Sequence, residues 1–141
     1  MAKLPKFVLV AAGLSALAAT PLAAQSEARI SKGEEELAEM LEGRVAGEPE
    51  SCIRTFSNRS LQVIDGTALV YRDGKTLWVN RTRSPRTLDD RDYLVIRKFG
   101  GSASELCRLD NVTTHDRGSN FFSGVIMLED FVPYRMADAE G

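Results

Sequence analysis

The chain has 141 residues, of which 43% are hydrophobic and 27% charged, and its formal net charge is −2. This length holds one domain with a core of its own and leaves no room for a second. A charge so close to neutral argues against a general nucleic-acid binder, which needs a strongly basic surface.

The first 24 residues have the layout of a secretory signal peptide. Lys3 and Lys6 give a positive start, an apolar run covers residues 7–17, and small residues lead to Ala24. The run is shorter than the roughly 20 residues of a membrane-spanning helix. We predict cleavage near Ala24 and a periplasmic or secreted protein that has no membrane span after processing.

Residues 25–50 form an acidic leader that is predicted to contain a short helix. Ser31 and Glu34 have the spacing of a capping box, and Leu37 and Leu41 fall on one helical face. A helix this short is marginal alone, so we expect it to cover a surface of the domain. The alternative is a frayed acidic leader.

From residue 51 onward the hydrophobic period changes to two. Segments rich in β-branched and aromatic residues predict strands at 52–56, 61–64, 67–72, 76–83, 92–99, 105–114 and 121–128. No long helical period separates them, which excludes a parallel α/β sheet. We predict a mainly β fold, a small antiparallel meander or partly closed barrel over residues 51–135, with one N-terminal α-helix and a disordered tail at 136–141.

The sequence Asp73-Gly74 predicts a two-residue hairpin loop in which Arg72 pairs with Lys75. This register gives the hairpin two apolar faces. One carries Ala68, Val70, Leu77 and Val79, and the other carries Leu69, Tyr71, Trp78 and Asn80. We expect the domain core to take one face and the helix to cover the other. The alternative leaves Tyr71 and Trp78 open as an apolar contact face for a partner.

Both cysteines, Cys52 and Cys107, lie in the predicted mature part of the chain. In an exported protein an even number of cysteines points to a disulfide rather than to a metal site. The bond would close a loop of about 56 residues, for which chain entropy gives roughly 4 kcal/mol of stability. We therefore predict a disulfide that decides whether a domain of this size folds.

Residues 81–91 carry the highest local concentration of arginine in the chain. The candidate anion-binding or partner-binding residues are Arg81, Arg83, Arg86 and Arg91. Guanidinium groups bind phosphates, carboxylates and acidic sugars through paired hydrogen bonds. The alternative is that Asp89, Asp90 and Asp92 neutralise the arginines locally.

No motif for catalysis or metal binding is apparent. His115 is the only histidine, and no nucleophile motif accompanies it. Zinc sites need several His or Cys residues at short spacing. We predict no catalytic residue, no metal and no cofactor, while the loop carboxylates at 89–92 and 129–130 leave an enzyme as an unsupported alternative.

Four short motifs lie one after another along the predicted mature part. They are Cys52-Ile53, Val79-Asn80-Arg81, the segment from Leu106 to Asp110, and Phe131-Val132-Pro133. Together they resemble a family of small exported proteobacterial proteins classed as a domain of unknown function. Members often carry two further cysteines, at the positions of Ser84 and about Ile126 here. The joint absence of both implies that they pair with each other and that Cys52 pairs with Cys107. The resemblance implies an exported domain and supplies no activity.

We interpret the chain as an exported binding or structural protein of the cell envelope that is not an enzyme. Its partner would be an unknown envelope component or protein. The main alternative is a small proteinaceous inhibitor of an exported hydrolase, a role that compact disulfide-bonded β domains often serve.

Overall fold

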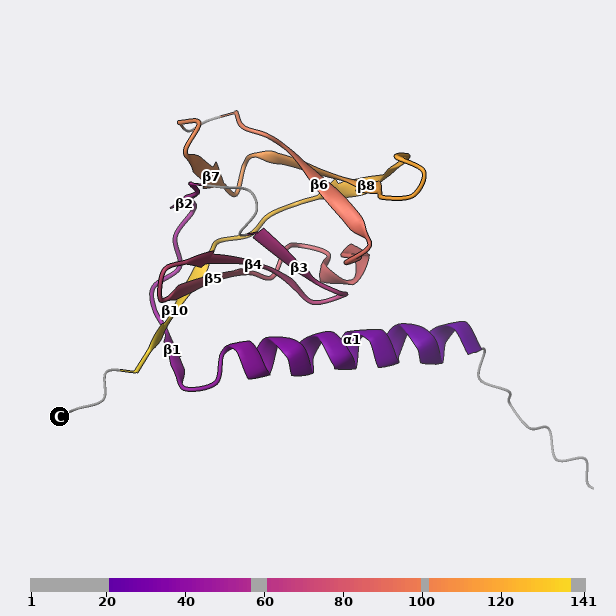
Figure 1. Cartoon of the computed structure of the whole chain (residues 1–141), viewed down its shortest axis with the longest axis horizontal. Coiled ribbons are helices and arrows are strands. Elements are labelled where there is room, and N and C mark those ends of the chain that lie inside the picture. The colour runs from indigo at the N-terminus through magenta and orange to yellow at the C-terminus, as the bar shows by residue number, and fades with distance from the viewer. Residues whose placement is uncertain (1–20, 57–60, 100–101, 138–141) are drawn as a thin grey trace, which may run out of the picture.

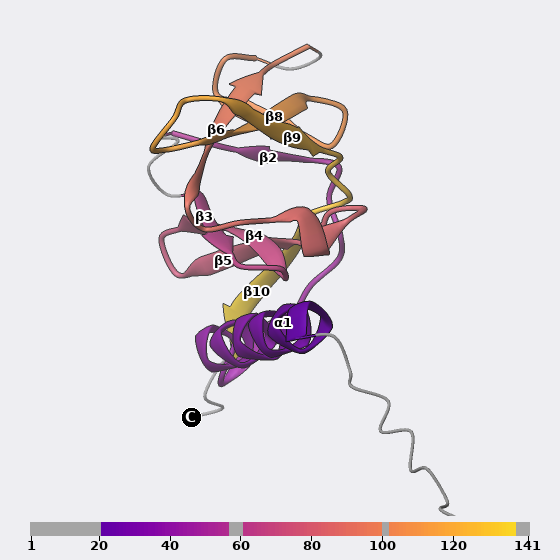
Figure 2. The same cartoon turned by 90° about the vertical axis from the view of Figure 1, so that its right-hand side faces the viewer.

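The computed structural model describes residues 21–56, 61–99 and 102–137. Its three layers are a long helix, a five-stranded sheet, and an upper layer of two smaller sheets (Figures 1 and 2). The predicted signal peptide lies outside the described residues except for 21–24, which form the first turn of the helix α1 (Pro21–Met40). The described helix α1 lacks the continuous apolar length that crossing a membrane requires.

All strand pairs in the described residues are antiparallel. The strands are β1 (Arg44–Ala46), β2 (Cys52–Arg54), β3 (Leu61–Ile64), β4 (Ala68–Asp73), β5 (Thr76–Asn80), β6 (Asp92–Arg97), β7 (Glu105–Cys107), β8 (Asn111–Asp116), β9 (Phe122–Ile126) and β10 (Val132–Met136). The sheets have the orders β1-β10-β5-β4-β3, β2-β7 and β6-β8-β9. A mainly β fold with one N-terminal helix is therefore confirmed, and the described sheets form layers rather than a closed barrel.

The five-stranded sheet has a hydrophobic core on each side. The core under the helix contains Leu37, Ile64, Ala68, Val70, Leu77 and Val79. The interlayer core, between this sheet and the upper layer, contains Ile53, Leu69, Tyr71, Leu88, Leu106, Val112, Ile126, Leu128 and Phe131. This arrangement confirms that the helix covers one face of the β4–β5 hairpin while the domain core takes the other.

The predicted pairing of Arg72 with Lys75 is wrong. The closing pair of the hairpin is Asp73 with Thr76, so the two loop residues are Gly74 and Lys75. Gly74 has a φ of +54°, and turns that carry Gly at their first central position suit the twist of a hairpin. The loop thus lies one residue further along than predicted. The partner of each residue is two positions later than predicted, and every residue keeps its face because side chains alternate with a period of two.

Two terminal predictions also need correction. The helix is 20 residues long and runs through Ser31 without starting there, because the residues before Ser31 are rich in alanine and other good helix formers. Strands β1 and β10 were not predicted, and β10 extends into the tail that was expected to be disordered. The backbone N–H of Ala137 donates to the carbonyl oxygen of Gly43 at 3.1 Å, so Met136 and Ala137 belong to the folded structure.

At Gly33, which is buried, the helix lies directly against the turn between β3 and β4. A Cβ atom at this position would lie 2.2 Å from the carbonyl oxygen of Asp65 and 2.3 Å from Oγ1 of Thr67. The first of these atoms belongs to the backbone and cannot rotate away. Glycine at this position therefore sets the distance between the helix and the sheet.

We predict that Gly33→Ala destabilises the protein by about 1–3 kcal/mol, the usual cost of overpacking a core. In a free helix the same change would stabilise by about 1 kcal/mol, so the sign of the effect tests the contact. Denaturant unfolding followed by the fluorescence of Trp78, the only tryptophan, measures it. The exposed neighbour Lys32, changed to alanine, serves as the control and should have little effect.

Candidate functional site

The predicted disulfide joins Cys52 of β2 to Cys107 of β7, which are direct partners in the two-stranded sheet. Directly after it, Arg108, Leu109 and Asp110 form the turn that leads into β8. The predicted single strand over 105–114 is therefore two strands with a turn between them.

A buried carboxylate holds this turn in place. The side chain of Asp110 accepts hydrogen bonds from the backbone N–H of Cys107 and from that of Phe99, each at 2.8 Å. The N–H of Arg108 donates to the carbonyl oxygen of Ser51 at 2.8 Å. The turn is thus attached to the residue before β2, to β7 and to the segment after β6. Its central side chain, Leu109, is 82% exposed.

Next to this turn lies a groove of about 480 Å³, which we call the Phe99–Met127 groove. It is lined by four large apolar side chains that are strongly exposed, namely Phe99 (74%), Leu109 (82%), Val125 (51%) and Met127 (58%). Exposed apolar side chains are unremarkable singly, but a contiguous group with a polar rim marks an interaction site.

Charged groups of both signs form the rim of the groove. Arg83 pairs with Glu129 at 3.1 Å, and Arg108 pairs with Asp130 at 3.3 Å. Exposed ion pairs of this kind contribute little to stability, so their charged ends can exchange partners at small cost. An apolar centre with a charged rim that contains arginine is the usual layout of a protein–protein interface.

The arginines predicted from residues 81–91 do not converge on one site. Arg81 pairs with Glu34 of the helix, Arg83 with Glu129, and Arg91 with Asp89 at 2.7 Å. Local neutralisation by an aspartate of the same segment is thus found for Arg91. The partners of Arg81 and Arg83 are distant in sequence, and spacing gives no sign of them.

The remaining arginine of the segment, Arg86, is exposed and contacts the helix through its backbone. Its carbonyl oxygen accepts a hydrogen bond from Nη2 of Arg29 at 2.9 Å. Of the four predicted residues, Arg83 alone lines the Phe99–Met127 groove.

The open contact face at Tyr71 and Trp78 is a wrong prediction. Tyr71 is 3% exposed within the interlayer core, and its hydroxyl oxygen accepts a hydrogen bond from the backbone N–H of Phe56 at 3.0 Å. Trp78 is half-buried, with the guanidinium of Arg135 6.0 Å from its ring centroid. The upper layer covers this face because the hairpin is apolar on both sides.

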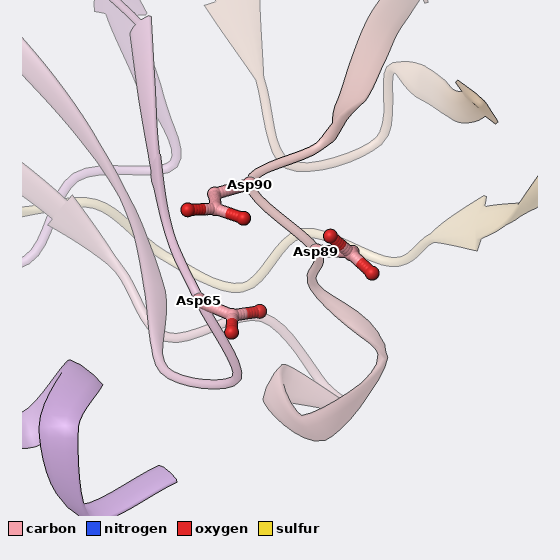
Figure 3. A group of neighbouring side chains, drawn as sticks. All are labelled: Asp65, Asp89 and Asp90. Atoms are coloured by element: carbon pink, nitrogen blue, oxygen red, sulfur yellow. The ribbon is translucent and has the colours of Figure 1, made fainter. Parts of the chain in front are cut away.

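Three carboxylates gather where the helix, the β3–β4 turn and the loop before β6 meet. Figure 3 shows Asp65, Asp89 and Asp90, each with an oxygen within 4.8 Å of the others. Arg29 of the helix lies 3.5 Å from Asp65, and Arg91 binds Asp89. Two of the three carboxylates are thus engaged by arginines, and the cluster joins the helix to the two loops.

The environments of Asp65 and Asp89 shift their pKa values in opposite directions. Burial raises the pKa of Asp65 above its ordinary value, and Arg29 opposes this rise without cancelling it. Hydrogen bonds from the side chain of Arg91 lower the pKa of Asp89. The ionised form is therefore favoured at Asp89 and disfavoured at Asp65.

His115 lies in β8 and packs among aromatic side chains. Its ring is stacked on Tyr93 with centroids 5.4 Å apart, and it meets the edge of Phe122 at 5.9 Å. Nε2 lies 3.2 Å from the hydroxyl of Thr113. In the described part of the chain this ring has no carboxylate within ion-pair distance, so the described residues place no acid beside it for a catalytic pair.

Comparison of the chain with protein-family models, with curated proteins and with solved structures found no match.

The lowered pKa of Asp89 predicts the direction of a change in stability. Asp89→Asn should lower the free energy of unfolding by about 1 kcal/mol at pH 7, because the ionised form is stabilised in the folded state. This loss is full above the ordinary pKa of 3.8 and disappears as the pH falls through the lowered pKa. Denaturant unfolding measured between pH 2 and 7, a range set by the ordinary carboxyl titration, tests it.

Asp65→Asn should act in the opposite direction. Its folded-state pKa is raised, so the neutral side chain stabilises the fold above that pKa and has no effect below 3.8. If Asp65→Asn and Asp89→Asn both lower the free energy of unfolding at pH 7, this assignment of the cluster is wrong.

Replacing both cysteines with alanine should cost roughly 2–4 kcal/mol, because the bond closes a loop with a sequence separation of 55 residues. Adding a reductant to the native protein should reproduce the loss, and it should leave the double variant unchanged. Equal stability of the oxidised, reduced and double-alanine forms would show that β2 and β7 stay together without the bond.

Proposed function

We propose that this chain is an exported, non-catalytic binding protein of the cell envelope that holds a protein partner in the Phe99–Met127 groove. The observation that carries the proposal is the gathering of Phe99, Leu109, Val125 and Met127, all strongly exposed, along one groove. The disulfide and the signal-peptide layout support an oxidising destination. The motif resemblance to small exported proteins is part of this proposal.

The chemistry of the groove indicates what the partner offers. Leu109 and Phe99 are large and apolar, and burying them against a partner removes their surface from water. Arg83 and Glu129 at the rim suit charged groups of either sign on the partner. We infer a partner that presents apolar side chains flanked by charged ones, in which a few central contacts carry most of the affinity.

The test is site-specific photo-crosslinking in cells that produce the full chain. A photoreactive amino acid replaces Leu109, and a matched variant carries it at Lys75, which is exposed at the tip of the β4–β5 hairpin and does not line the groove. We expect one envelope protein to be crosslinked from position 109 and not from position 75.

Affinity for that partner should then fall when the groove is made acidic. Leu109→Asp and Met127→Asp are each expected to weaken binding at least tenfold, about 1.4 kcal/mol, while Lys75→Asp has no effect. Both groove residues are exposed, so the variants should unfold at nearly the denaturant concentration of the native protein. Identical crosslinks from positions 109 and 75, or full binding by both acidic variants, would refute the proposal.

A second candidate function, inhibition of an exported hydrolase, is favoured by the turn at Leu109. Its side chain is 82% exposed while the disulfide and Asp110 hold the turn on both sides. A rigid protruding loop can enter an enzyme cleft without a large ordering cost. If the crosslinked partner is a hydrolase whose activity falls in proportion to bound protein, this candidate replaces the first.

A further inference from the structure

The chain has four methionines, and Met127 differs from the others in its surroundings. Met1 lies outside the described residues, and Met40 packs against the core under the helix. Met127 and Met136 are both largely exposed, at 58% and 54%. Of these two, Met127 alone lines the Phe99–Met127 groove. One of two comparably exposed thioethers thus lies where the partner is proposed to bind.

Arg83 contacts Met127 through both its backbone and its side chain. The backbone N–H of Arg83 donates to the carbonyl oxygen of Met127 at 2.8 Å. Nη1 of the same arginine donates to the sulfur of Met127 at 3.9 Å, while its Nε donates to Oε1 of Glu129 at 3.1 Å. A thioether sulfur is a weak acceptor. The sulfur of Met127 therefore lies beside an N–H donor that it uses only weakly.

Residues 80–83 are fixed against residues 127–129, so this contact does not depend on one exposed side chain. Asn80 is fully buried, and its amide group bonds to the backbone N–H and C=O of Glu129 at 3.1 and 2.5 Å. Its Oδ1 also accepts a hydrogen bond from the N–H of Thr82 at 3.0 Å. Thr82 has a φ of +38°, which a β-branched residue keeps only where its surroundings hold it. Hydrogen bonds around a buried side chain thus set the place of Arg83 beside Met127.

Peroxides oxidise methionine to the sulfoxide, which turns an apolar side chain into a polar one. With hydrogen peroxide, the sulfur attacks one oxygen, and an S–O bond forms as the O–O bond breaks. The proton of the transferred oxygen passes to the departing hydroxide, which leaves as water. The sulfur loses two electrons and the peroxide gains them. Methionine sulfoxide reductases reverse the change.

We propose that Met127 is an oxidation site at which a peroxide converts the groove from an apolar to a polar state, and that Arg83 binds the sulfoxide oxygen. A methionine side chain has three rotatable bonds, so the new oxygen can turn toward Nη1 of Arg83 while Nε keeps its bond to Glu129. The groove loses an apolar side chain, and the partner would have to bury a polar group in its place. This inference rests on the proposed function, because it concerns the same groove.

The first test needs no partner. The full chain is treated with hydrogen peroxide, the sulfoxides are located by mass spectrometry, and the side-chain N–H signals of the arginines are followed by NMR. We expect sulfoxide at Met127 and Met136, and a shift of the Arg83 signals. Met127→Leu should abolish this shift. Met136→Leu is the matched control of similar exposure, and it should show the same shift as the native chain.

The second test measures binding to the protein that position 109 captures. Only the purified full chain is oxidised, and the peroxide is removed before the two proteins are mixed. Oxidation should weaken binding roughly tenfold or more in the native chain and in Met136→Leu, and by less than about twofold in Met127→Leu. Met127→Gln, which is polar and has no sulfur, should bind weakly without peroxide. Treatment with both methionine sulfoxide reductases should restore the oxidised native chain.

Stability separates these losses from unfolding. Met127 is exposed, so the oxidised chain and Met127→Gln should unfold at nearly the denaturant concentration of the native protein.

Three results would overturn the proposal. These are a Met127 that stays unoxidised where Met136 is oxidised, Arg83 signals that do not move when Met127 is oxidised, and equal binding by the oxidised and untreated chains. Failure of the proposed function looks different. Position 109 then captures no protein, while the Arg83 signals still decide whether this arginine binds an oxidised Met127.

Discussion

The burial of the five-stranded sheet on both faces is the constraint on which the rest of this structure depends. In β4, Ala68 and Val70 face the helix while Leu69 and Tyr71 face the upper layer, and all four are nearly inaccessible to water. A sheet that is apolar on both sides is stable only between two covering layers. The glycine at position 33 that lets the helix approach, and the disulfide that holds β2 to β7 in the upper layer, both serve this requirement.

Much of this architecture could be predicted from local patterns. The period-two segments located most strands, and the apolar residues on both faces of the hairpin anticipated the two covers. The elements that were predicted wrongly, or not at all, have physical explanations. Ser31 has the spacing of a helix start, yet the alanine-rich residues before it favour a helix themselves, and α1 begins at Pro21. Strand β10 contains Pro133, a residue that disfavours a central strand, and three-residue β1 is too short to show a period.

The candidate sites were harder to predict, because each gathers residues from separate segments. Arg83, Phe99, Leu109 and Met127 reach one groove from four parts of the chain, and nothing in their spacing connects them. One signal was available in β9 and the residues after it. There Val125 and Met127 alternate with Ile126 and Leu128, so the segment is apolar on both faces, as the hairpin is. The inner pair is buried in the core and the outer pair is exposed in the groove. In ion pairs such as Arg81 with Glu34, the arginine and the acid are distant in sequence, so no local sequence pattern predicts the pair.

The place of β10 in the sheet has a consequence for how the chain acquires its structure. β10 lies between β1 and β5, and its last residue, Met136, pairs with Arg44 of β1. The sheet is therefore incomplete until residue 136 is in place, and pairing residues this far apart in the sequence slows folding. Since β1 reaches the sheet only through β10, this edge of the sheet cannot form before the C-terminal strand is present.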